Sequence, residues 1–133
     1  MRDWPADALV FGLGKSGFGA IAYLRARGVR VTATDAAPLE KLGEAGARLE
    51  EWGVKFEALS SELCARASVV VVSPGVSYFT PELEAARAAG VPVWGEVELA
   101  ARELQGPIVG ITGSNGKTTT TALTGHLFAE AGV

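Results

Sequence analysis

The sequence predicts an α/β fold: a Rossmann-like, doubly wound domain built on a five-stranded parallel sheet. Short apolar runs alternate with longer amphipathic segments along residues 8–104, as expected of successive βαβ units. Val69–Val72 is uniformly apolar and β-branched, which is typical of a central parallel strand buried on both faces. A glycine-rich turn, Gly12–Gly17, joins the first apolar run to the first amphipathic segment. These three observations predict a nucleotide-binding domain of parallel topology.

The first βαβ unit is expected close to the N-terminus. Ala8–Phe11 is a short apolar run and predicts the first strand. Phe18–Arg27 predicts a helix, because its apolar residues recur three or four positions apart and its arginines lie near its end, where cations suit the helix dipole. Gly28 is expected to cap that helix. Val29–Thr34 then forms the second strand, which ends just before Asp35.

The middle of the chain carries weaker signals. Pro38–Trp52 is expected to be helical but interrupted by Gly43 and Gly46, since glycine disfavours a helix interior. Val54–Phe56 predicts a short third strand, and Ser61–Arg66 predicts a brief helix that leads to the valine-rich fourth strand.

The last part of the sheet begins with a strong helix start. Residues 80–82 (Thr-Pro-Glu) supply a capping hydroxyl, a proline at the first helical position and an acid in the first turn. The helix is expected to run to Gly90. Val91–Trp94 is then the fifth strand, and Glu96–Leu104 a further helix. We place the end of the first domain here, so that residues 1–95 form one unit.

Residues 96–133 are expected to begin a second, incomplete α/β domain. Pro107–Ile111 predicts a strand and Thr118–Ala131 a helix, with Val133 as the first residue of another strand. One strand and one helix cannot bury their apolar faces. We therefore expect the N-terminal piece of a longer protein, in which this segment packs on the first domain, pairs between chains or moves freely.

The composition narrows the classes of function. A net charge of −3 without a basic cluster argues against non-specific nucleic-acid binding. Cys64 and His126 are the only residues of their kinds, so neither an internal disulfide nor a zinc site of the usual Cys/His type is expected. No apolar run approaches the about 20 residues of a membrane span, and the first residues do not resemble a signal peptide. We expect a cytoplasmic protein that does not enter a membrane.

The segment Gly113–Thr119 has the residue types that hold a triphosphate. Glycines let backbone N–H groups at a helix start approach phosphate oxygens. Lys117 would add a cation for the β- and γ-phosphates, and the Thr118 hydroxyl would supply an oxygen ligand for Mg²⁺. The strict Walker pattern has a glycine where this chain has Ile111. The alternative is an ordinary glycine-rich turn between a strand and a helix.

A second anion site is expected where the first strand meets the first helix. Gly12, Gly14 and Gly17 have the spacing of the nucleotide-binding fingerprint. Asp35 ends the second strand, where a carboxylate can accept hydrogen bonds from a sugar or a base. On this signal alone the site would take a dinucleotide; alternatively, the glycines serve only close packing of helix on strand. Lys15 either adds a cation for phosphate or faces solvent.

The loop Ser73–Val76 is expected to border the same site. It follows the valine-rich strand, and in a doubly wound order that strand lies beside the first. The loop would then sit at the crevice where the strand order reverses and ligands bind. The alternative is an ordinary turn, which the Pro-Gly pair favours in any case.

Four motifs in this order resemble the Mur ligases of peptidoglycan synthesis, most closely the MurD type: Gly12–Gly17, Ser73–Val76, Gly95–Leu99 and Thr112–Thr119. The resemblance implies that the first domain holds the UDP end of UDP-N-acetylmuramoyl-L-alanine. The residues implied at that substrate are Gly14, Lys15, Ser16, Gly17, Asp35, Ala36, Ser73 and Gly75. Those implied at ATP are Gly113, Ser114, Asn115, Gly116, Lys117, Thr118 and Thr119. Relatives often have polar residues where this chain has Ala36 and Ala37.

The resemblance also implies a reaction, in a cytoplasmic step of cell-wall synthesis that supports cell shape and division. ATP would activate the substrate carboxylate as an acyl phosphate, which the amine of D-glutamate then attacks. Lys117 and Thr118 are implied as catalytic residues, Thr118 as the Mg²⁺ ligand. The family's remaining magnesium ligands and its amino-acid-binding domain have no counterpart here, so these 133 residues alone are not expected to ligate. A monomer is implied for the full-length protein, and self-association is expected of this shorter chain.

Two other interpretations stay open at this stage. A stand-alone NAD(P)-binding oxidoreductase or sensor domain explains Gly12–Gly17 and Asp35 but leaves Gly113–Thr119 without a purpose. A non-catalytic nucleotide-binding module would explain both loops without a reaction.

Overall fold

Five parallel strands form the centre of the molecule. The structure, a computed structural model, describes residues 4–132. The strands β1 (Asp7–Phe11), β2 (Arg30–Thr34), β3 (Lys55–Phe56), β4 (Val70–Val72) and β5 (Val93–Gly95) pair in the order β3-β2-β1-β4-β5. Every neighbouring pair is parallel, and Val10 of β1 lies opposite Ala33 of β2 and Val71 of β4. The predicted parallel sheet, with the fourth strand beside the first, is confirmed.

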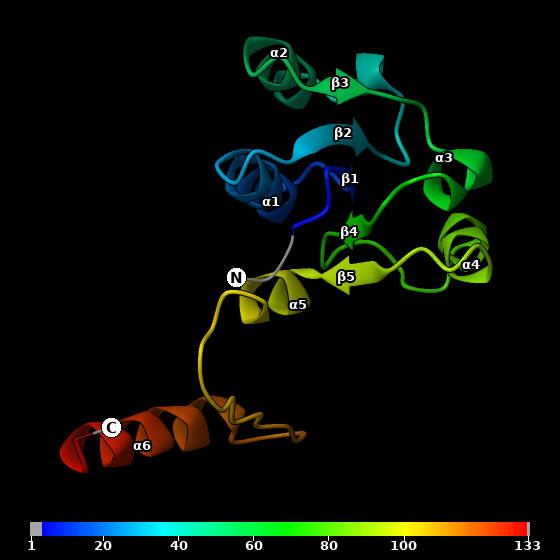
Figure 1. The fold of residues 1–133 in the computed structure, drawn as a ribbon. Coiled ribbons are helices and arrows are strands. Elements are labelled where there is room, and N and C mark those ends of the chain that lie inside the picture. The colour runs from blue at the N-terminus through cyan, green and yellow to red at the C-terminus, as the bar shows by residue number, and fades with distance from the viewer. Residues whose placement is uncertain (1–3, 133) are drawn as a thin grey trace.

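Helices cover both faces of the sheet (Figure 1). One face carries α1 (Lys15–Arg25), α2 (Glu44–Glu51) and α5 (Glu96–Ala101), and the other carries α3 (Ser61–Ala65) and α4 (Pro81–Ala88). A 3₁₀ turn, η1 (Leu39–Lys41), precedes α2, and α6 (Lys117–Glu130) is the last helix. Among residues 4–132, no helix combines the length and the apolar character needed to cross a membrane.

Each face of the sheet has its own apolar core, because side chains alternate along a strand. Ala8 and Val10 of β1 belong to the core beneath α1, α2 and α5, whereas Leu9 and Phe11 belong to the core beneath α3 and α4. The residues Val69–Val72 divide between the two cores in the same way. This double burial is why the valine run is uniformly apolar rather than alternating.

The predicted helix over Pro38–Trp52 is instead a 3₁₀ turn followed by a separate α-helix. The chain forms η1, and Gly43 then adopts φ 51°, a left-handed conformation that glycine accepts most readily, immediately before α2. The interruption predicted at Gly43 is confirmed. Gly46 lies inside α2 and does not break it.

The predicted strand over Pro107–Ile111 is wrong. These residues form neither strand nor helix. A strand needs a neighbour to share its backbone hydrogen bonds, and Figure 1 shows this segment and α6 lying apart from the sheet. Several large apolar side chains of this segment and of α6 stay 44–59% exposed: Ile108, Val109, Leu123, Leu127 and Phe128. Of the three arrangements expected for this segment and α6, packing on the first domain is therefore not observed. Val133, the expected start of a further strand, lies outside the described residues.

The N-terminal segment closes on the end of the sheet unit. Trp4 packs edge-on against Tyr23 of α1 and Trp94 of β5, with ring centroids 5.8 and 6.3 Å away. The Arg27 guanidinium carbon lies 3.5 Å from the Tyr23 ring centroid, and Arg27 Nε donates to Glu103 Oε1 at 2.7 Å. These contacts fasten the first and last segments of the sheet unit to α1.

Candidate nucleotide-binding cleft

A cleft of about 570 Å³ opens at the carboxyl ends of β1, β2 and β4. Three loops meet there: Gly12–Ser16 after β1, Asp35–Ala36 after β2 and Ser73–Val76 after β4. Its lining contains seven of the eight residues predicted at a uridine diphosphate: Gly14, Lys15, Ser16, Asp35, Ala36, Ser73 and Gly75. In open parallel sheets this edge, where the strand order reverses, is where ligands bind.

The three glycines of the first loop have different roles. Gly12 adopts φ 97°, and a Cβ there would lie 2.8 Å from the Val76 side chain. At Gly17 a Cβ would lie 1.9 Å from the carbonyl oxygen of Gly12, so α1 packs directly on the loop. At Gly14 a Cβ would meet nothing within 4 Å. Packing explains Gly12 and Gly17, but not Gly14, whose missing side chain leaves room inside the cleft.

The amino end of α1 supplies hydrogen-bond donors to this space. Gly14 is the N-cap, no side chain accepts a hydrogen bond from the first turn, and that turn contains no acidic residue. Its N–H groups and the positive end of the helix dipole therefore remain available to an anion. Lys15 is exposed and lines the cleft beside them, adding a full positive charge. The arrangement suits a diphosphate.

Asp35 and Ser73 use their side chains on the loops of the cleft itself. Asp35 Oδ2 accepts a hydrogen bond from the Leu13 N–H at 2.8 Å, and Asp35 Oδ1 accepts one from the Ala37 N–H at 3.0 Å. Ser73 Oγ donates to the Gly12 carbonyl oxygen at 2.7 Å. Both residues therefore hydrogen-bond to the protein itself, which the sequence did not indicate. Their contact with a ligand remains a prediction.

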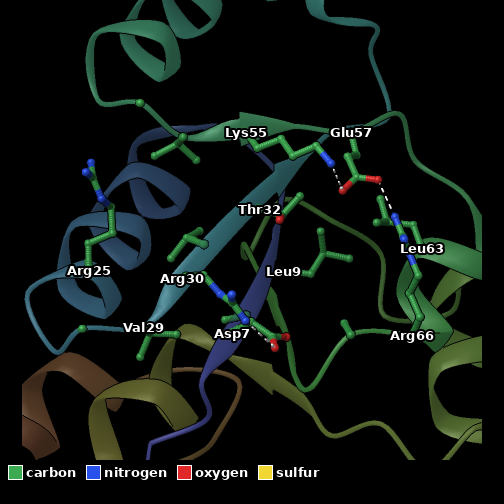
Figure 2. Close-up of a pocket in the computed structure, with 16 residues that line it drawn as sticks. Asp7, Leu9, Arg25, Val29, Arg30, Thr32, Lys55, Glu57, Leu63 and Arg66 are labelled. Atoms are coloured by element: carbon green, nitrogen blue, oxygen red, sulfur yellow. Dashed lines mark hydrogen bonds and ion pairs between the residues drawn. The ribbon is translucent and has the colours of Figure 1, made fainter.

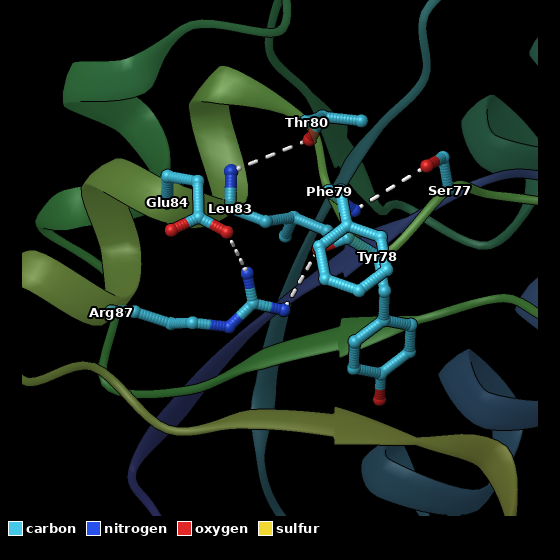
Figure 3. Close-up of polar contacts among 7 residues, drawn as sticks. All are labelled: Ser77, Tyr78, Phe79, Thr80, Leu83, Glu84 and Arg87. Atoms are coloured by element: carbon cyan, nitrogen blue, oxygen red, sulfur yellow. Dashed lines mark hydrogen bonds and ion pairs between the residues drawn. The ribbon is translucent and has the colours of Figure 1, made fainter.

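Ser77 and Thr80, at the two ends of the loop that Figure 3 shows, also line the cleft. The Ser77 hydroxyl accepts from the Phe79 N–H at 3.3 Å, and Arg87 of α4 donates to the Tyr78 carbonyl oxygen at 2.9 Å. Thr80 closes the loop as the N-cap of α4. These contacts hold the backbone, while the Phe79 side chain is left 87% exposed.

No residue of the second predicted cradle, at the start of α6, lines this cleft, and Figure 1 shows α6 apart from the sheet. Gly116 is the N-cap with φ 78°, and the first turn of α6 has neither a side-chain cap nor an acidic residue. Lys117 Nζ donates to the Gly113 carbonyl oxygen at 2.6 Å, so its charge lies over the loop. Thr118 and Thr119 are exposed. Donors, cation and hydroxyl are therefore together, as a nucleoside triphosphate with Mg²⁺ requires.

A larger hollow, of about 710 Å³, extends from the amino ends of β1 and β2 across the sheet toward Glu57 and α3 (Figure 2). Most of its charged groups pair with one another: Glu57 lies 3.1 Å from Lys55 and also pairs with Arg66, and Asp7 lies 3.9 Å from Arg30. The hydrogen bond from Lys55 is the main cause that lowers the pKa of Glu57. In the described part of the chain no cluster of His, Cys, Asp and Glu could hold a metal ion. The cleft at the carboxyl edge therefore remains the candidate ligand site.

The sequence pattern of one protein family, described as Mur ligase MurD-like, N-terminal domain, matches residues 6–95. That span covers the five strands and every loop of the cleft at their carboxyl ends. The chain belongs to the MurD-like Mur ligases.

Named relatives of this MurD-like chain agree with the family match. It is 54% identical to UDP-N-acetylmuramoylalanine--D-glutamate ligase of Myxococcus xanthus and 50% identical to the enzyme of that name from Solibacter usitatus, with 92% and 100% of this chain aligned. It spans only 28% and 29% of the length of those two relatives. Among solved structures, UDP-N-acetylmuramate-alanine ligase MurC from Thermotoga maritima superposes on 92% of this chain and 29% of its own, with a TM-score of 0.56 at 25% identity.

The cleft of this MurD-like chain contains more residues than the predicted set. Gly17 does not line it, whereas seven residues outside that set do: Phe11, Gly12, Leu13, Pro74, Val76, Ser77 and Thr80. Leu13 lies inside the predicted glycine motif, so the sequence motif could have indicated its place in the cleft. Ser77 and Thr80 follow the Ser73–Val76 motif, and the sequence predicts Thr80 only as a helix cap. Contact of Gly17 with a ligand remains a prediction.

Proposed function

We propose that this chain is the UDP-substrate-binding part of an ATP-dependent ligase that joins D-glutamate to UDP-N-acetylmuramoyl-L-alanine during peptidoglycan synthesis. The observation that carries the proposal is the cleft at the carboxyl edge, which gathers seven of the eight residues expected at the uridine diphosphate from three separate loops. The names of the relatives point to the same reaction.

In this proposal each part of the cleft has its own role. The N–H groups at the start of α1, with Lys15 and Ser16, bind the diphosphate, and Gly14 gives it room. Gly75, which lines the cleft in the loop after β4, would lie beside the phosphates. Asp35 and the backbone of Ala36 lie at the uracil end. The methyl side chain of Ala36 cannot hydrogen-bond, so recognition of the base there falls to backbone groups.

The loop before α6 is proposed to hold ATP with Mg²⁺. Gly113–Thr119 would wrap the phosphates, Lys117 would leave the Gly113 carbonyl to meet the β- and γ-phosphates, and the Thr118 hydroxyl would be a magnesium ligand. Magnesium supplies charge neutralisation at the phosphates when bound. Lys117 would stabilise the charge on the phosphoryl group during its transfer to the substrate carboxylate, which gives the acyl phosphate that D-glutamate attacks.

The proposed organisation is a substrate domain over residues 1–95, followed by the start of an ATP-binding domain over 96–133, in a cytoplasmic enzyme. The full-length protein is proposed to act as a monomer. The present chain is proposed to self-associate through the apolar side chains that are exposed on α6.

Calorimetric titration of the protein with UDP-N-acetylmuramoyl-L-alanine, UDP and NAD⁺ tests the proposal. We expect both uridine ligands to bind with a Kd of about a micromolar or weaker, and NAD⁺ to bind less tightly than either. Tighter binding of NAD⁺ would favour a dinucleotide-dependent oxidoreductase or sensor instead. Folded protein that gives no heat with UDP-N-acetylmuramoyl-L-alanine would contradict the assignment of the cleft.

A further inference from the structure

Side chains from both neighbouring strands hold the glycine loop of the cleft. Asp35, after β2, accepts a hydrogen bond from the Leu13 N–H at 2.8 Å. Ser73, after β4, donates one to the Gly12 carbonyl oxygen at 2.7 Å. Backbone bonds accompany them on each side, from the Gly12 N–H to Thr34 and from the Ser73 N–H to Phe11. Two adjacent peptide groups of the loop after β1 are therefore fixed from opposite directions.

The loop needs such support because two of its residues, Gly12 and Gly14, have no side chain. Gly12 adopts φ 97°, and Gly14 has no neighbour within 4 Å of a would-be Cβ, so neither residue gains order from side-chain packing of its own. Glycine also loses more conformational freedom on folding than any other residue. A loop of this kind binds phosphate well only if its N–H groups already point to where the phosphate will lie.

Asp35 brings a carboxylate to a cleft that is proposed to bind an anion. A carboxylate at the edge of an anion-binding cleft repels phosphate, so on charge alone it would weaken the binding of a diphosphate. Both of its oxygens already accept backbone N–H groups, Oδ2 from Leu13 and Oδ1 from Ala37. Its contacts thus join the loop after β1 to the loop after β2, across 22 residues of chain.

We propose that Asp35 and Ser73 are positioning residues, which clamp Gly12 and Leu13 so that the N–H groups at the start of α1 are aimed at the diphosphate. They act on the ligand through the loop, in addition to any contact of their own. The inference rests on the proposed function of the cleft as a uridine diphosphate site. The clamp and a purely direct role of Asp35 predict different effects on affinity. Loss of a clamp weakens the binding of every ligand that carries the diphosphate, whereas loss of a direct contact weakens only the binding of the nucleoside part.

Titration with UDP and with inorganic pyrophosphate tests this distinction. In Asp35→Asn we expect the affinity for both ligands to fall by a similar factor, about tenfold, although a negative charge has been removed from the site. Ser73→Ala, which removes only one hydroxyl, should weaken both ligands about threefold. Asp7→Asn is the matched control, because Asp7 also accepts a backbone N–H, from Ser68 at 3.3 Å, but at the opposite edge of the sheet. That variant should bind both ligands as the unchanged protein does.

A loss of UDP affinity with unchanged or stronger pyrophosphate binding would overturn the clamp and leave Asp35 as a nucleoside contact. Hydrogen exchange without any ligand decides the matter independently. The Leu13 amide should exchange at least about tenfold faster in Asp35→Asn than in the unchanged protein and in Asp7→Asn. Equal exchange rates in the three proteins would refute the clamp. If the unchanged protein bound neither ligand, the proposed function would fail, and the exchange rates would still decide whether Asp35 holds the loop.

Discussion

Gly14 and Gly17 are three residues apart in one motif, yet the structure gives a side chain very different room at the two positions. We expect Gly17→Ala to lower the free energy of unfolding by about 3 kcal/mol, because its Cβ would lie 1.9 Å from the Gly12 carbonyl oxygen. Gly14→Ala should unfold within about 0.5 kcal/mol of the unchanged protein, since its Cβ meets nothing within 4 Å. Urea denaturation followed by circular dichroism measures both.

The effect of Gly14→Ala on UDP affinity should be large, although its effect on stability is small. Folded Gly14→Ala is expected to lose about tenfold in UDP affinity, because the methyl group would occupy the space that the diphosphate needs. Titration calorimetry measures this loss. Unaltered UDP affinity in Gly14→Ala would show that the open position does not face the ligand.

Cys64 is expected to be chemically inert in the folded protein. It lies on α3, its side chain is fully buried in the core beneath α3 and α4, and this burial raises the pKa of the thiol to about 11. At pH 8 only about one thiol in a thousand would then be ionised, and the thiolate is the reactive form. A thiol-reactive disulfide reagent should therefore label Cys64 only after urea is added. Rapid labelling without urea would contradict the buried position.

The raised pKa of Cys64 also sets a direction for stability against pH. The folded state favours the protonated thiol, so this contribution is complete below the ordinary pKa of 9.0 and is lost as the pH rises toward about 11. Cys64→Ala should lose less stability than the unchanged protein between pH 9 and pH 11. Thermal unfolding at the two pH values provides the measurement.

At the scale of residues, the motif predicted which loops meet, but not how their side chains are used. The spacing of Gly12, Gly14 and Gly17 was enough to place a cleft after β1. It did not show that Asp35 and Ser73 would bond to that loop, because these contacts depend on the register of three strands that are distant in sequence. The structure supplies that register.

Among the elements, the bridge from Arg27 to Glu103 joins the end of α1 to the residues after α5. The hydrogen bond from Arg27 is the main cause that lowers the pKa of Glu103 below its ordinary value of 4.5. A lowered carboxylate pKa contributes stability above that value, and the contribution is lost as the pH falls below it. Glu103→Gln should therefore lose less thermal stability than the unchanged protein between pH 7 and pH 3.5.

Glu130→Gln is the control for this experiment, since Glu130 lies on α6, which has no buried residue. Its acid sensitivity should equal that of the unchanged protein. If Glu103→Gln also matched it, the bridge would contribute nothing to the stability of the sheet unit.

The helix α3 depends on its cap because it has only five residues. Ser60 Oγ accepts a hydrogen bond from the Leu63 N–H at 3.1 Å. Ser60→Ala should cost about 1 kcal/mol of unfolding free energy, and Ser60→Thr should retain most of it. Ser61→Ala, one residue inside the helix and exposed, should cost less than about 0.5 kcal/mol in the same urea titration.

The pattern of apolar residues predicted the strands that pair in the sheet. It failed at Pro107–Ile111, where no neighbouring strand is present among the described residues. All five strands of the sheet were predicted within about two residues, because each contributes apolar side chains to one or both of the two cores. Pro107–Ile111 is equally apolar but has no strand beside it, so the same pattern does not produce a strand. α1 begins three residues earlier than predicted, at Lys15, because the glycine loop already carries its first turn.

For the molecule as a whole, the boundary between the two units can be located by shortening the chain. Leu99 of α5 is 4% exposed and belongs to the core beneath α1, and Glu103 bridges to α1. A chain that ends at Gly106 should unfold within about 2 °C of the complete chain, because α6 buries nothing. A chain that ends at Gly95 should unfold at least about 5 °C lower, since it loses Leu99 and the bridge.

Thermal unfolding followed by circular dichroism distinguishes these outcomes. Equal stability of the two shortened chains would place the boundary at Gly95, as the sequence alone suggested. A large loss in the chain that ends at Gly106 would show that α6 supports the sheet. UDP binding should persist in that longer fragment, because every residue that lines the cleft precedes Gly95.

All three tryptophans, Trp4, Trp52 and Trp94, lie in the sheet unit. Trp52 stacks edge-on against Phe18, and Trp4 lies beside Trp94, whereas α6 and its loop contain none. The intrinsic ultraviolet emission of the protein therefore reports only on the sheet. Any event at Gly113–Thr119 is optically silent unless it reaches the strands. A change in that emission on adding a nucleoside triphosphate would be a direct sign that the two halves of the chain communicate.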